Sequence, residues 1–178
     1  MKKSLIAGAG IAALGLAVVP FAGVFAADTM SMEDTINVTI ADACTFDAAS
    51  HSYTKDMTAN TTADIGTTTM KVTCNNYSGY EVTGKYTALA GNGTNKISFG
   101  ESAPTAGVSS WAANAIVTVD GGSPVAAAYL KNNGAVMSNI RQTVEAGDTA
   151  VITYKAATSN NIAAGTYTGT ATYTLTKK

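Results

Sequence analysis

The 178-residue chain has few of the side chains that carry out chemistry. It contains one histidine, one tryptophan and two cysteines, and only 13% of its residues are charged. Acidic and basic residues nearly balance, with a formal net charge of −1, and beyond the N-terminus the only basic cluster is Lys177-Lys178. A protein that binds nucleic acid needs a basic face, so we do not expect nucleic acid as a partner.

The residue patterns typical of enzymes and metal sites are also absent. No His-Glu-x-x-His, glycine-rich phosphate loop or calcium-loop pattern occurs. The histidine, His51, lies in a polar stretch near Asp47 and Asp56, with no nucleophile or metal-ligand spacing beside it. We therefore expect a solvated loop histidine, no catalytic residue, no metal and no cofactor. Of the function classes considered, a secreted enzyme has the least support.

One long apolar run is present, at the start of the chain. A basic start, Lys2-Lys3, precedes an apolar stretch from Leu5 to Val19, and Val24-Phe25-Ala26 follows. This order is typical of a cleaved secretory signal peptide, and an uncleaved N-terminal membrane anchor is the alternative. No second apolar segment follows, so we expect a secreted, cell-surface protein that does not span the membrane after cleavage. The predicted parts are a signal peptide (1–26), a flexible segment (27–34) and one domain (35–178).

The two cysteines, Cys44 and Cys74, fit one structural disulfide. An even pair in an exported chain is expected to be oxidised. Each cysteine ends or follows an alternating run of residues, so both are expected to face inward from neighbouring strands. No Cys-x-x-Cys pattern suggests a catalytic use.

Alternating residues predict an all-β fold. In the C-terminal run 165–176, threonine occupies every even position from Thr166, while apolar and aromatic residues occupy the odd ones. Such alternation predicts a strand of about ten to twelve residues, and we expect it to be buried at the centre of the fold. Shorter runs of the same kind occur at residues 35–40, 68–74, 80–86 and 149–155. Seven to nine short strands separated by turns predict an immunoglobulin-like β-sandwich.

The C-terminal run Ala-Gly-Thr-Tyr, ending in Tyr173-Thr174-Leu175, resembles the closing strand of WxL-type bacterial surface domains. Tyr80-Glu81-Val82 is loosely similar to the earlier motif of that family. In both places the tryptophan of the family pattern is replaced by tyrosine. The resemblance implies a secreted β-rich domain that binds cell-wall peptidoglycan or another surface protein. The signal peptide, early disulfide and alternating final strand also resemble pilin and spore-coat-like subunits.

The aromatic residues and the chain's strands leave two function hypotheses open. Tyr80, Tyr173 and Trp111 could form a surface that stacks on sugar rings, or they could fill the core. The first hypothesis is therefore a non-catalytic cell-surface module that binds wall glycan or a surface protein. The second is a fimbria-like structural subunit that self-associates by strand addition, with the N-terminal segment 27–34 and residues 35–40 as the donor or the C-terminal strand as the acceptor edge.

Overall fold

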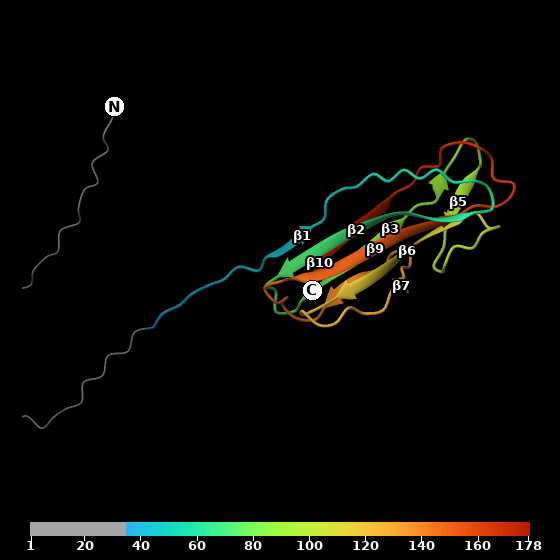
Figure 1. Cartoon of the computed structure of the whole chain (residues 1–178). Coiled ribbons are helices and arrows are strands. Elements are labelled where there is room, and N and C mark those ends of the chain that lie inside the picture. Colours follow the sequence, from blue (N-terminus) through green and yellow to red (C-terminus); the bar gives the residue numbers. More distant parts are fainter. Residues whose placement is uncertain (1–34) are drawn as a thin grey trace, which may run out of the picture. The chain divides into compact units, whose positions relative to one another are not determined.

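Residues 35–178 are described by a computed structural model (Figure 1). The chain divides into two units, residues 1–39 and residues 40–178, and each is described by itself. In the first unit, residues 35–39 form neither helix nor strand, and all are exposed. The predicted signal peptide (1–26) and flexible segment (27–34) lie outside the described residues.

The second unit is all-β, and its described residues form strands and no helix. The strands are β1 (Cys44–Asp47), β2 (Thr62–Cys74), β3 (Tyr80–Tyr86), β4 (Leu89–Ala90), β5 (Lys96–Phe99), β6 (Ser110–Thr118), β7 (Ala128–Tyr129), β8 (Gly134–Asn139), β9 (Asp148–Ala157) and β10 (Ala171–Lys177). Residues 35–178 accordingly contain no helix with the length and apolar character that a membrane span requires.

The strands form two sheets (Figure 1). The larger, seven-stranded sheet has the order β1-β2-β9-β6-β5-β4, with β7 paired to β6 as well. The smaller has three strands in the order β10-β3-β8. All pairs are antiparallel except β5 with β6, which are parallel. β1 and β10 are therefore edge strands, one in each sheet.

The two sheets share one hydrophobic core, because alternate residues of each strand point inward. β3 supplies Tyr80 and Val82 from the small sheet, and β2 and β9 supply Met70 and Ile152 from the large one; each is at most 1% exposed. Burying a side chain of this size stabilises a fold by roughly 1.5–3 kcal/mol. The centre of both sheets is therefore the main source of stability.

Glycine is required at two turns that bring the chain close to a neighbouring backbone. Gly79 precedes β3 with a φ of 82°, and a Cβ there would lie 2.2 Å from the carbonyl oxygen of Asn139. Gly147 precedes β9 with a φ of 75°, and its Cβ would lie 2.7 Å from the carbonyl oxygen of Val72. Both the left-handed conformation and the close approach favour glycine.

Three strand predictions need correction. No strand forms at residues 35–40, since none of the described strands pairs with them. The C-terminal strand is shorter than predicted and lies at a sheet edge, so the prediction that it is buried at the centre was wrong. β8 was not predicted, because its sequence Gly-Ala-Val-Met-Ser-Asn does not alternate between polar and apolar residues. The strand predicted at 80–86 is confirmed as β3.

Candidate functional site

The three aromatic residues predicted to line a binding surface are not gathered on one. Tyr80 is fully buried and Trp111 is 3% exposed, with its indole Nε1 donating a hydrogen bond to the carbonyl oxygen of Thr87 at 3.1 Å. Tyr173 alone is half-buried. Since stacking on a sugar needs an exposed ring face, Tyr80 and Trp111 do not form a glycan-binding surface in this structure. They fill the core instead.

The predicted disulfide is present between Cys44 and Cys74. The two cysteines are directly opposite each other in the pairing of β1 with β2. The link closes a sequence separation of 30 residues, for which the chain-entropy account gives a stabilisation of about 3–4 kcal/mol. The bond fastens the edge strand β1 to the long strand β2.

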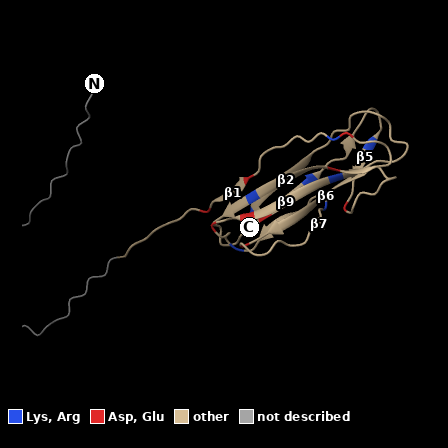
Figure 2. Cartoon of the chain, in the orientation of Figure 1, with Lys and Arg blue, Asp and Glu red and all other residues tan. Residues whose placement is uncertain are grey.

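The described residues contain no group of three or more histidine, cysteine, aspartate or glutamate side chains that could hold a metal. His51 is exposed and stacks on Tyr53 with ring centroids 5.8 Å apart. Figure 2 shows charged residues of both signs spread over the strands and loops of the described part of the chain.

A buried carboxylate ties the two sheets together. Asp148, at the start of β9, is 0% exposed and accepts hydrogen bonds from the Tyr80 hydroxyl at 2.6 Å and the Asn139 amide at 3.0 Å. It also accepts one from the backbone N–H of Asp120 at 2.8 Å. Burial, and then the bond to Asp148, raise the pKa of Tyr80 well above its ordinary value. This network fixes the smaller sheet on the larger one, which is a structural role.

The two edge strands β1 and β10 border an open margin, which we call the seam. One side is β10 with the preceding residues 162–170, and the other is β1 with the following residues 48–59. Among the described strands, β10 pairs only with β3 and β1 only with β2. The backbone edges that face the seam therefore have no strand partner in the described part of the chain.

Apolar side chains along the seam are only half covered. On the β10 side they are Ala171, Tyr173 and Leu175, and the β1 side contributes Phe46, with Tyr53 and Met57 farther along it. All of these pack against the core without being fully buried. A groove of about 1040 Å³ runs along this part of the seam. An unpaired strand edge beside half-covered apolar residues is a place where another strand can pair.

Aromatic residues form the floor of the groove. Trp111 of β6 and Tyr154 of β9 lie there with ring centroids 6.4 Å apart. The Tyr154 and Tyr173 hydroxyls are 2.9 Å apart and form a hydrogen bond that joins the two sheets. Burial raises the pKa of both tyrosines. Both hydroxyls therefore remain protonated at neutral pH, and they are suited to packing and hydrogen bonding.

One wall of the groove is built by a residue that the sequence did not single out. Tyr53 donates a hydrogen bond from its hydroxyl to the carbonyl oxygen of Thr67 at 2.6 Å and packs on Tyr154 at 5.6 Å. Its ring occupies the space above Gly66, where a Cβ would come within 2.2 Å of it. β2 carries an irregularity at this point, between Asp64 and Gly66. Gly66 lies before the alternating run 68–74, so the residue pattern contains no signal for this wall.

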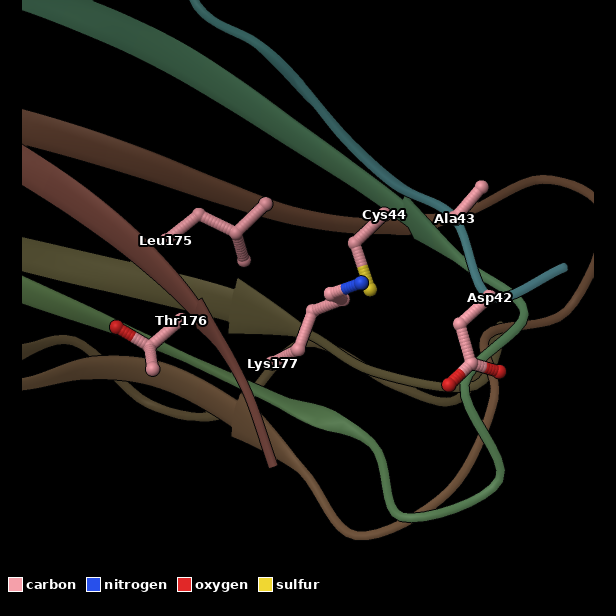
Figure 3. Close-up of a pocket in the computed structure, with 6 residues that line it drawn as sticks. All are labelled: Asp42, Ala43, Cys44, Leu175, Thr176 and Lys177. Carbon is pink, nitrogen blue, oxygen red and sulfur yellow. The ribbon is translucent and has the colours of Figure 1, made fainter.

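At the other end of β10 the seam has a second hollow, of about 610 Å³. Figure 3 shows the side chains of Cys44, Leu175 and Lys177 directed into the same space. Lys177 forms no salt bridge with any residue in the range 35–178. Asp42 also lines this hollow. The seam thus has one acidic and one basic side chain at this end and aromatic residues along the rest.

The segment just before β1 has unusual exposure. Ile36 is 84% exposed, and Val38 and Ile40 are each 79% exposed. The chain just after Ile40 is held in place by Asn75, whose side chain accepts a hydrogen bond from the Ala43 N–H at 2.6 Å and donates one to the Ala41 carbonyl at 3.1 Å. An alternating apolar segment that pairs with none of the described strands therefore precedes residues 41–43, which Asn75 holds in place.

No protein-family model, curated protein or solved structure matches the chain.

Proposed function

We propose that the protein is a secreted structural subunit that self-associates by strand addition, each copy inserting residues 35–40 into the seam of another. The observation that carries the proposal is that the chain contains both a segment that could be donated as a strand and a strand edge that could accept it. Ile36, Val38 and Ile40 are exposed at alternate positions, and the seam offers an unpaired strand edge above half-covered apolar residues.

The donor segment fits the chemistry of the seam. In an extended strand, Ile36, Val38 and Ile40 point to one face while Thr35, Asn37 and Thr39 point to the other. Such a strand would cover Tyr173 and Leu175 on its apolar face and pair its backbone with the free edge of β10. Burial of three aliphatic side chains contributes roughly 5–9 kcal/mol before the cost of ordering the segment.

The added strand would also complete the fold. The two sheets share one core, and an extra strand beside β10 gives the smaller sheet a fourth member. An immunoglobulin-like β-sandwich of this kind is the architecture that the alternating sequence predicts. The signal-peptide pattern and the disulfide support export to an oxidising compartment and a place at the cell surface.

A peptidoglycan-binding role of the WxL type has less support. The interpretation depended on exposed aromatic rings, and two of the three residues, Tyr80 and Trp111, are buried. Strand addition depends instead on Ile36, Val38 and Ile40, which are exposed. We therefore favour a protein partner, another copy of this chain, over a glycan.

The proposal is tested by comparing the secreted form with a variant in which Ile36, Val38 and Ile40 are each replaced by serine. Sedimentation velocity and electron microscopy should show concentration-dependent assemblies of the parent protein and a monomeric variant. The matched control replaces Thr35, Asn37 and Thr39, on the opposite face, by serine and should assemble normally. A parent protein that stays monomeric at all concentrations would overturn the proposal.

A further inference from the structure

We propose that a second surface of the donor copy takes part in the contact between copies. This surface, which we call the loop end, consists of residues 75–79 and 140–144, and its apolar contacts are Tyr77 and Ile140. Its partner is another copy of this chain, the one whose seam holds residues 35–40. The inference rests on the proposed function and adds to the donor segment a surface on the folded domain.

The five most exposed large apolar side chains of the described residues lie in only two places. Three of them, Ile36, Val38 and Ile40, are in the donor segment. The other two are Tyr77, which is 88% exposed, and Ile140, which is 82% exposed; every other one is at most 63% exposed. Single exposed apolar residues are normal on a protein surface, whereas a group of them indicates an interaction site.

The two loops of the loop end lie against each other. The backbone N–H of Cys74, the last residue of β2, donates a hydrogen bond to the Thr143 hydroxyl at 3.0 Å, and the Thr143 N–H donates one to the Cys74 carbonyl oxygen at 2.8 Å. Farther along, a Cβ on Gly79 would lie 2.7 Å from the backbone nitrogen of Arg141. The two loops therefore form one continuous surface at this end of the domain.

A short piece of chain joins the loop end to the donor segment. Ile40 is followed directly by Ala41, whose carbonyl oxygen accepts a hydrogen bond from the Asn75 side chain at 3.1 Å. Ala43 is bonded to Asn75 twice, through its N–H and its carbonyl oxygen. From Ile40 to Ala43 the chain spans at most about 10 Å. When Ile40 pairs with a strand of another copy, the loop end beside Asn75 must therefore lie against that copy.

This close approach does not depend on the direction in which the donor runs along β10. Leu175 is half-buried toward one end of the seam, and Ile162 and Tyr167 are half-buried toward the other. Either end therefore offers apolar area that Tyr77 and Ile140 can cover. Because hydrogen bonds already hold the loop end in place, it adds contact area at little cost in conformational entropy.

The test compares serine substitutions at the two ends of the domain in the secreted form, read by sedimentation velocity. Tyr77→Ser/Ile140→Ser should raise the concentration needed for assembly by about tenfold, the loss expected when large apolar contacts are removed from an interface. Circular dichroism of the dilute protein checks that this variant is folded.

Val108→Ser is the matched control and should assemble like the parent protein. Val108 is 60% exposed and lies just before β6, whose first residue is near the Ala157 end of β9, while β2 reaches Cys74 at the opposite end. A loss of the same size in Val108→Ser, or no loss in the double variant, would overturn the inference.

Chemical footprinting detects the contact directly. Tetranitromethane nitrates accessible tyrosines, so Tyr77 should react readily in the variant with serine at positions 36, 38 and 40 and several times less in assemblies of the parent protein. Tyr129 of β7, which pairs with β6 and not with the strands of the seam, is the internal reference and should react equally in both.

Equal nitration of Tyr77 in both samples would overturn the inference and leave strand addition in place. A parent protein that never assembles removes the proposed function itself, so the two failures are distinct.

Discussion

Strands β3 and β10 lie side by side and have the same kind of sequence, yet their surroundings differ. β3 alternates around Tyr80 and Val82, both 0% exposed. β10 alternates around Tyr173 and Leu175, and both remain half-buried. The difference is that β3 has a strand on each side and β10 has only β3 among the described strands. Alternation determines which face of a strand is apolar, whereas neighbours determine how well that face is covered.

The first prediction uses the same residue type in both strands. Tyr80→Ala should lower the free energy of unfolding by about 3–5 kcal/mol, the range for truncating a buried aromatic ring. Tyr173→Ala should cost about 1–2 kcal/mol in the monomer, because much of its ring area is already exposed. Urea unfolding of both variants measures the contrast. Equal losses in monomeric protein would mean that β10 is as well covered as β3.

The second prediction concerns the buried carboxylate beneath β3. Asp148→Asn replaces an acceptor of three hydrogen bonds by a group with only one acceptor oxygen and should cost about 2–3 kcal/mol. Asp64→Asn is the control, since Asp64 is exposed and pairs only with Lys155 on the surface. Thermal unfolding should separate the two variants clearly. If Asp148→Asn lowers the melting temperature no more than the control does, the hydrogen-bond network does not stabilise the contact between the sheets.

The third prediction concerns the link between β10 and the larger sheet. Tyr154→Phe deletes the hydroxyl that bonds to Tyr173 across the seam floor and should cost about 1 kcal/mol. Because the ring is kept, the groove retains its shape and assembly should persist. Loss of assembly in a well-folded Tyr154→Phe protein would show that the hydroxyl pair itself takes part in the contact between copies.

We expect the smallest loss of stability when the pH is lowered. Acid breaks the ion pair between Asp120 and Arg141, which follows β8. Hydrogen bonds from Arg141, with its Nε 2.9 Å from the carboxylate, and from Asn139 hold the pKa of Asp120 below its usual value. The stabilisation that Asp120 contributes is therefore present above about pH 4, the pKa of an aspartate in the unfolded chain. It is lost as the pH falls through the lower pKa of the folded state. Melting temperatures between pH 5 and pH 2 should fall less steeply in Arg141→Gln than in the parent protein.

Much of the strand pattern could be predicted from the sequence. β3 has the predicted boundaries, and β9 extends the predicted strand by one residue at its start and two at its end. Alternation is a local signal, so it identifies a strand wherever the strand's own residues carry it. The disulfide could be predicted on a different ground, because an even pair of cysteines in a chain with an export pattern is expected to be oxidised. Its predicted position in phase with residues 35–40 was not needed, since that run forms no strand.

Sheet position could not be predicted, because it depends on contacts between residues far apart in the chain. The sequence of β10 has the strongest alternation in the protein, which led to the prediction of a central strand, yet nothing in it specifies a second neighbour. The groove wall at Tyr53 depends likewise on a glycine thirteen residues later. The seam is therefore a property of the assembled sheets and not of any single segment.

The link between Cys44 and Cys74 has a mechanical consequence for a filament built in this way. Tension transmitted from one copy to the next would arrive at residue 40, four residues before the covalent bond. The load would then pass directly into the thirteen-residue strand β2, which pairs with β9 over most of its length. Stretching would have to shear that long ladder all at once, whereas without the bond it could peel the short β1 away one residue at a time.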